Sequence, residues 1–176
     1  GEFPLLPTRE LTFHNVSGLS REWEQKRIYL LHRISASQCP GVCGSFEAFL
    51  LRTMPPEVMK ENSLTLSLGK EYSLSELSSA LERLGYSRAA TVEGPGQYAI
   101  RGGIFDVFPA GSARPVRTEF FGDEPDSMGY FDTQTQRRTE NISSFTLLPA
   151  SEVLTSSLQG SVLAERLRGL TKSSAK

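Results

Sequence analysis

Short strand-like segments separated by turn signals follow one another through the second half of the chain, from residue 89 to residue 149. Glycine, proline and aspartate favour tight turns, and they cluster at 94–96, 109–112, 122–123 and 132–133. The segments between these clusters predict strands near 89–93, 97–108, 115–121, 127–131 and 142–148. Spacers this short cannot hold the crossovers that parallel strands need, so the pattern predicts an antiparallel, hairpin-linked sheet.

A capped helix is expected just before these strands. Ser73 and Glu76 have the spacing of a capping box, which satisfies the free backbone amides at a helix start. Leucines recur at helical spacing from Leu74 to Leu84, and Gly85 then supplies the residue type that commonly ends a helix. We expect this helix, over 74–84, to cover one face of the sheet.

The first third alternates helices with short strands, which is typical of a layered α/β fold. Its longest predicted helix carries an apolar stripe of Trp23, Leu30, Leu31 and Ile34. The elements expected outside the sheet are a strand at 11–13, a helix from Ser20 to about Ile34, a buried strand at 41–44, a helix at 45–53 that Pro55 and Pro56 stop, a half-buried strand at 64–68, and a last helix at 157–170. The chain is thus predicted to be mixed α/β.

Composition narrows the function classes. The 176 residues are 38% hydrophobic and 22% charged, as in a globular domain, and no apolar run approaches the length of a membrane span. The formal net charge of -1 argues against electrostatic binding of nucleic acid. No secretory signal is recognisable at the start, and Gly1 to Phe3 looks like a cloning remnant, so we expect a cytoplasmic fragment of a longer protein.

Motifs for catalysis, cofactors or metals are not recognisable in the sequence. The glycine-containing runs lack the lysine of a phosphate-binding loop, and the acidic group Asp123, Glu124 and Asp126 directly follows Gly122, as in a solvated turn. Cys39 and Cys43 form a single C-x3-C pair, too few ligands for structural zinc, and Cys43 is expected to be a buried strand thiol. We therefore expect a binding module rather than an enzyme.

Alternation along 115–121 suggests where such binding takes place. Period two puts Val116, Thr118 and Phe120 on one face of this strand and Arg117, Glu119 and Phe121 on the other. An exposed face with phenylalanine beside arginine suits a protein interface, where both residue types are enriched. Arg101 and Arg88 are candidates for the same surface. The alternative is that these arginines are ordinary solvated side chains, with Glu119 as a surface partner.

The sequence resembles the module shared by UvrB and the bacterial transcription-repair coupling factor (Mfd) family. The resemblance is carried by 94–109, 115–124, 130–132, 135–138 and 147–150. The stretches 10–31 and 55–58 also resemble the first domain of the coupling factor. The resemblance implies part of a degenerate RecA-like helicase domain at 4–62, an inserted antiparallel-sheet α+β domain at 63–150 that binds UvrA, and a return to the first domain at 151–176.

The resemblance also implies binding residues and partners. Its UvrA-contacting pattern falls on Arg101, Arg117 and Phe121, and more weakly on Arg88, while UvrB carries a further arginine where this chain has Ala99. Such a module recruits UvrA of nucleotide excision repair to stalled RNA polymerase, and other domains of the longer protein contact the polymerase and double-stranded DNA. The alternatives are a fragment of UvrB and an active DNA-dependent ATPase domain.

Overall fold

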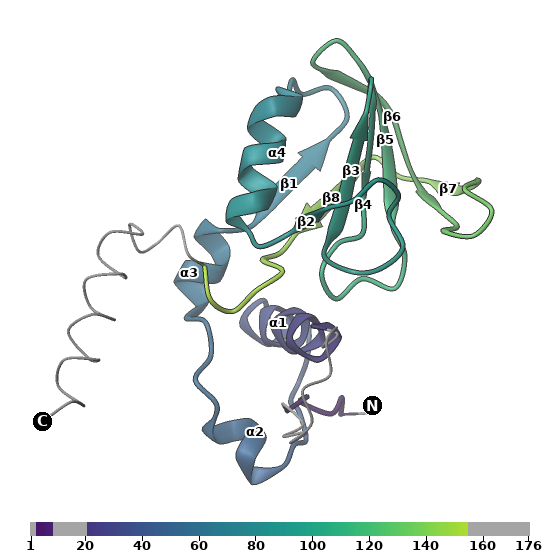
Figure 1. The fold of residues 1–176 in the computed structure, drawn as a ribbon. Helices are drawn as coiled ribbons and strands as arrows, with labels where there is room; N and C mark the ends of the chain where they lie inside the picture. Colours follow the sequence, from purple (N-terminus) through teal and green to yellow (C-terminus); the bar gives the residue numbers. More distant parts are fainter. Residues whose placement is uncertain (1–2, 9–20, 155–176) are drawn as a thin grey trace, which may run out of the picture.

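The computed structural model describes residues 3–8 and 21–154, which form a mixed α/β fold with two β-sheets (Figure 1). Helices dominate the first third and strands the remainder, as the sequence predicts. The elements, in chain order, are α1 (Glu22–Ser35), α2 (Phe46–Leu50), α3 (Pro56–Glu61), β1 (Leu64–Ser67), α4 (Leu74–Arg83), β2 (Ser87–Arg88), β3 (Gln97–Arg101), β4 (Ile104–Val107), β5 (Val116–Phe121), β6 (Glu124–Phe131), β7 (Arg138–Asn141) and β8 (Ser144–Leu147).

The larger sheet has six strands in the order in which they occur in the chain, from β2 to β7. Its neighbours pair antiparallel, as the short connections predict, except that β2 runs parallel to β3. The smaller sheet is an antiparallel ribbon of β1 and β8, in which Leu64 pairs with Leu147. The ribbon therefore brings the two ends of the strand-rich region together.

Helix α4 covers one face of the six-stranded sheet, which confirms the prediction from its capping box and leucine spacing (Figure 1). The Ser73 hydroxyl accepts a hydrogen bond from the Glu76 backbone amide at 3.5 Å, and Gly85 after the helix has φ of 85°. The buried leucines of α4 and residues of both sheets form one apolar core. This core includes Leu66, Leu77, Leu81, Tyr98, Phe105, Val107, Val116, Met128 and Leu147.

Several predicted strand boundaries are wrong. The segment 97–108 is a hairpin of β3 and β4, because Gly102 has φ of 61° and turns the chain there. A Cβ at Gly103 would lie 2.7 Å from the Phe120 carbonyl oxygen, so that position also needs glycine. The expected strand at 89–93 is instead the two-residue strand β2 at 87–88, and β7 was not predicted.

The first third also differs from the prediction in detail. The helix that starts after Ser45 ends at Leu50 instead of Thr53, and α3 begins at Pro56, where the sequence predicted only a stop. In place of a strand at 41–44, Cys43 forms one parallel bridge with Leu5. Cys43 is exposed, not buried as expected, because bridged residues point to the same side and Leu5 is itself 72% exposed. The strand expected at 11–13, the cap at Ser20 and the helix at 157–170 lie outside the described residues.

Helix α1 packs against the segment that follows β8. Ile28 lies in an apolar cluster with Leu148 and Leu154. The Glu24 carboxylate accepts a hydrogen bond from the Glu152 backbone amide at 2.7 Å. Arg27, which interrupts the predicted apolar pattern, is also buried. Polar contacts as well as apolar ones therefore join the first third to the end of the sheet domain.

Tyr86 joins three segments of the sheet domain from a buried position. Its hydroxyl donates a hydrogen bond to the Leu148 carbonyl at 2.9 Å and accepts one from the Ala110 amide at 3.0 Å. Burial raises the pKa of the Tyr86 phenol, so the group stays protonated and able to donate.

Substituting Tyr86 with phenylalanine is expected to lower the free energy of unfolding by about 1–3 kcal/mol, because both backbone partners would then be buried without a hydrogen bond. Urea denaturation followed by circular dichroism measures the loss. Tyr72→Phe is the matched control. The Tyr72 hydroxyl also accepts a hydrogen bond from the Ser67 backbone amide and donates one to the Thr65 carbonyl, but it lies in a more exposed place. An equal loss in both variants would contradict the importance of burial at Tyr86.

Candidate protein interaction surface

The face of the six-stranded sheet opposite α4, called here the outer face, carries three of the four predicted site residues. Strand register aligns Arg101 with Ile104, and Ile104 with Glu119, so these side chains share a face. Phe121 follows on β5 two residues after Glu119, and therefore points to the same side. The residues of this face are Ala99, Arg101, Ile104, Asp106, Phe108, Arg117, Glu119, Phe121, Ser127, Gly129, Phe131 and Arg138.

One end of the outer face is covered and apolar. Val92, Ala99, Phe108 and Phe131 form a small buried cluster there, and Ala99 is 1% exposed. An arginine at position 99 would have to enter this cluster or displace it. This end of the face is therefore part of the core in this chain.

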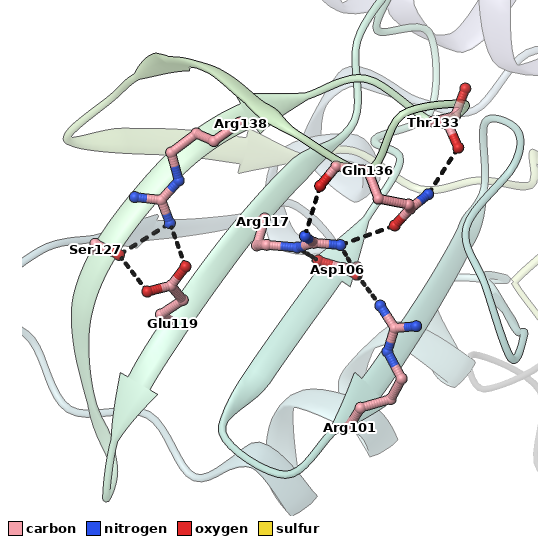
Figure 2. Close-up of polar contacts among 8 residues, drawn as sticks. All are labelled: Arg101, Asp106, Arg117, Glu119, Ser127, Thr133, Gln136 and Arg138. Atoms are coloured by element: carbon pink, nitrogen blue, oxygen red, sulfur yellow. Dashed lines mark hydrogen bonds and ion pairs between the residues drawn. The ribbon is translucent and has the colours of Figure 1, made fainter.

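A buried carboxylate holds two arginines in the middle of the outer face (Figure 2). The Asp106 side chain is 1% exposed. Its Oδ1 accepts a hydrogen bond from Arg117 Nε at 2.6 Å, and its Oδ2 accepts from Arg117 Nη2 at 2.8 Å. Arg101 Nη2 donates to the same Oδ2 at 2.7 Å. Two positive charges thus share one negative charge at this point.

The loop between β6 and β7 completes the environment of Arg117. Gln136 accepts two hydrogen bonds from Arg117, through its backbone oxygen at 3.0 Å and its side-chain oxygen at 2.9 Å. The Arg117 guanidinium also lies 4.6 Å from the centre of the Phe131 ring. The hydrogen bonds to Asp106 raise the pKa of Arg117 further, so its charge is permanent. Arg117 is consequently fixed in place, with its side chain 15% exposed.

Asp132 gives this loop its shape. Its Oδ1 accepts hydrogen bonds from the Thr135 amide at 2.7 Å, the Thr135 hydroxyl at 2.9 Å and the Gln134 amide at 3.1 Å. These donors favour the ionised carboxylate and lower the pKa of Asp132. The turn leaves Gln136 with φ of 60°, in the left-handed region, and directs its side chain to Arg117.

The other end of the outer face is open to solvent. Phe121 is 87% exposed, and Ile104 is 36% exposed. Arg101 has 46% of its side chain exposed, in contrast with the enclosed Arg117. Near them, Arg138 Nη2 donates hydrogen bonds to Glu119 at 3.0 Å and to Ser127 at 2.9 Å (Figure 2). An apolar group bordered by charged groups is the arrangement expected of a protein-binding surface.

Arg88 is not brought to this surface. It pairs in register with Tyr98, whose hydroxyl contacts Ser78 and Glu82 of α4. Paired residues on neighbouring strands point to the same side of a sheet, so Arg88 lies on the α4 face. The structure thus groups Arg101, Arg117 and Phe121 and places Arg88 on the opposite face.

Sequence reasoning missed Asp106, Gln136 and Arg138. A signal for Asp106 was present, because it is the one charged residue in the otherwise apolar run 104–108. A carboxylate buried within such a run needs a positively charged partner. Gln136 and Arg138 left no comparable signal, because they reach the face from a loop and an edge strand. Arg138 crosses the sheet over Gly129, where a Cβ would lie 2.9 Å from its Cδ.

Two features are absent from the described part of the chain: clusters of metal-binding side chains and helices able to span a membrane. Within 3–8 and 21–154, no group of three or more His, Cys, Asp or Glu side chains could hold a metal ion. In the same part of the chain, every helix is too short or too polar to cross a bilayer.

Comparison with known proteins identifies the family. The model of the UvrB interaction domain matches residues 64–153, which begin at β1 and end after β8. A transcription-repair-coupling factor of Bacillus subtilis is 33% identical over 150 residues, which are 85% of this chain and 13% of that protein. Its counterpart in Haemophilus influenzae is 43% identical over 101 residues, 57% of this chain and 9% of that protein. The counterpart in Escherichia coli is 33% identical over 126 residues, 72% of this chain and 11% of that protein.

These relatives are much longer than the chain, which spans roughly a tenth of their length. The similarity to the Bacillus subtilis and Escherichia coli relatives extends into the first third, because their 150 and 126 aligned residues exceed the whole stretch 64–176. The chain therefore belongs to the UvrB interaction domain family, in the group represented by bacterial transcription-repair coupling factors.

Proposed function

We propose that this chain is a protein interaction module that binds UvrA through the open end of the outer face. In the longer protein, this binding recruits UvrA of nucleotide excision repair to stalled RNA polymerase in the cytoplasm. The observation that carries the proposal is Phe121, which is 87% exposed beside the charged residues of the sheet in a domain of this family. A large apolar side chain held in water at this place favours a partner that buries it.

The two residues that the sequence nominates most strongly have different parts in this proposal. Phe121 is free to enter a partner, and aromatic residues of this kind commonly dominate binding energy. Arg117 is committed to Asp106 and Gln136, so it contributes charge and shape from a fixed position. Arg101, with its larger exposure, is the arginine best placed to contact the partner.

The remaining parts of the proposal concern the longer protein. We assign 4–62 and 151–176 to a degenerate RecA-like helicase domain and 63–150 to the inserted domain. Contacts with RNA polymerase and double-stranded DNA belong to domains outside this chain, and the chain itself is not an enzyme. An assay of ATP hydrolysis with and without DNA tests the last point, since turnover by this chain would overturn it.

The alternative of a UvrB fragment is disfavoured by the link between the first third and the sheet. UvrB should carry a tyrosine-rich hairpin there, whereas 53–73 contains Tyr72 as its one tyrosine. This stretch is occupied by α3 at Pro56–Glu61 and by β1 at Leu64–Ser67, which pairs with β8. The short connections between these elements leave no room for an inserted hairpin.

Phe121→Ala is expected to weaken binding to purified UvrA by at least about thirtyfold, or about 2 kcal/mol, because truncation removes the exposed aromatic group of the surface. Isothermal titration calorimetry measures the affinity, and circular dichroism is expected to stay unchanged. Phe46→Ala is the matched control, since Phe46 is 74% exposed on α2, away from the outer face. Absence of binding by the unmodified chain, or equal losses in both variants, would reject the proposed surface.

A further inference from the structure

We infer that Asp106 is a positioning residue of the interaction surface, which holds Arg101 ready for a carboxylate group of the partner. The inference rests on the proposed function, because it concerns how the same surface recognises its partner. It assigns separate tasks to three charged side chains. Asp106 supplies the buried negative charge, Arg117 completes its neutralisation, and Arg101 presents the remaining positive charge to solvent.

The hydrogen-bond geometry separates the two arginines. Among the described residues, Arg117 donates four hydrogen bonds, two to Asp106 and two to Gln136, and a guanidinium has five N–H groups. Arg101 donates to Asp106 through Nη2 alone in the same part of the chain. Arg101 therefore retains donors for a partner, whereas Arg117 has almost none left.

The charges leave a net positive site. Asp106 carries one negative charge and is 1% exposed, while Arg101 and Arg117 carry one positive charge each. The surplus charge appears at Arg101, which is 46% exposed against 15% for Arg117. A planar guanidinium with free N–H groups matches a carboxylate, which it can bind through two parallel hydrogen bonds. The partner group that fits here is accordingly an aspartate or glutamate side chain.

Preorganisation explains why a buried acid helps a surface arginine. A free arginine side chain has several rotatable bonds, and ordering it on binding reduces affinity. The hydrogen bond of 2.7 Å to Asp106 restricts Arg101 before the partner arrives. Arg101 pairs with Ile104, and Ile104 pairs with Glu119 on the next strand. Phe121 follows Glu119 by two residues on β5. Charge and apolar contact are thus offered at a fixed spacing, two strands or roughly 10 Å apart across the sheet and two residues or roughly 7 Å apart along it.

A double-mutant cycle with UvrA tests the inference. The chain, Asp106→Asn, Arg101→Gln and the double variant are titrated with UvrA by calorimetry. Asparagine keeps the shape of Asp106 but removes the charge that orders Arg101. We expect each single variant to lose at least about tenfold in affinity, and the double variant to bind like Arg101→Gln, since Asp106 acts through Arg101. Independent losses that multiply in the double variant would overturn the inference.

Two further results keep the inference separate from the proposed function. In ¹⁵N-labelled protein without UvrA, the Arg117 Nε–H and Arg101 Nη2–H signals, whose donors bond Asp106, are expected to exchange faster with water in Asp106→Asn. Unchanged exchange overturns the positioning role even if the chain binds UvrA, whereas failure of the unmodified chain to bind UvrA overturns the proposed function instead. If Asp106→Asn does not fold, the affinity of Arg101→Gln for UvrA tests the inference instead. A loss of affinity below twofold would show that Arg101 does not contact the partner, and would overturn the inference. Arg114→Ala, an exposed arginine paired with Glu140, is the control that keeps full affinity.

Discussion

Asp106→Ala is expected to lower the free energy of unfolding by about 3–5 kcal/mol. The carboxylate is 1% exposed and accepts three hydrogen bonds from two guanidinium groups. Its removal leaves Arg117 partly buried beside Phe131 without its counter-charge, and desolvation of an unpaired charge is costly. Arg117 is then no longer fixed by Asp106, and the loop that Arg117 holds through Gln136 is expected to be less well ordered.

Urea denaturation of the purified variants measures this effect. Glu140→Ala is the matched control, because Glu140 of β7 also forms an ion pair, at 2.6 Å with Arg114 just before β5, but is 56% exposed. Exposed pairs contribute about 0–1 kcal/mol, so the control should change little. A loss below about 1 kcal/mol for Asp106→Ala would show that the cluster on the outer face is not a stabilising element.

Arg27→Ala is expected to cost a similar amount, about 3–5 kcal/mol, in the first third of the chain. The Arg27 side chain is 1% exposed and lies 3.3 Å from the Glu152 carboxylate. It also donates hydrogen bonds to the Pro7 carbonyl at 3.0 Å and to the Leu51 carbonyl at 3.5 Å. One guanidinium thus joins α1, the N-terminal segment, the end of α2 and the segment after β8, and alanine would release all four.

Thermal or urea unfolding of Arg27→Ala should be compared with the double variant Arg27→Met with Glu152→Gln. Removing both charges while keeping most of the volume avoids an unpaired buried carboxylate, so the double variant is expected to recover much of the loss. A double variant no more stable than Arg27→Ala would indicate that the contacts to Pro7 and Leu51 matter more than the ion pair.

The pH dependence of the Arg27→Ala loss has a defined sign. Burial raises the pKa of Glu152 above its ordinary value, against the lowering effect of Arg27. The folded state therefore binds this proton more tightly than the unfolded chain, and stability falls as pH rises from the unfolded pKa through the folded one. Without Arg27 the folded pKa rises further, so the loss should shrink on acidification towards pH 4. A loss that grows on acidification would contradict this assignment.

Local patterns in the sequence were sufficient for part of the fold and of the surface. The capping box of Ser73 and the leucine spacing up to Leu84 predicted α4, because both act within one turn of the helix. Alternation along β5 correctly separated buried Val116 and Thr118 from Phe121, since side chains on a strand alternate regardless of what surrounds it. Such features depend on residues that are near in sequence.

Features that depend on distant residues were missed. The role of Arg117 required Asp106 on the neighbouring strand and Gln136 from a loop, and no local rule relates these positions. The expected single strand at 97–108 concealed the hairpin, and with it the register that sets Arg117 opposite Asp106. Arg27 was overlooked because arginine is seldom fully buried unless it has a charged partner. That partner, Glu152, lies far along the chain, so no local pattern reveals it.

The pairing of Leu64 with Leu147 has a consequence for engineering this domain. Their Cα atoms lie opposite each other in an antiparallel ribbon, where such atoms are roughly 5 Å apart. The polypeptide thus enters and leaves the sheet domain at one point, as in domains that tolerate circular permutation or transplantation. Because its two ends lie close together, the segment 64–147 can be removed and replaced by a short linker. For the same reason, the segment can be inserted into a loop of another protein.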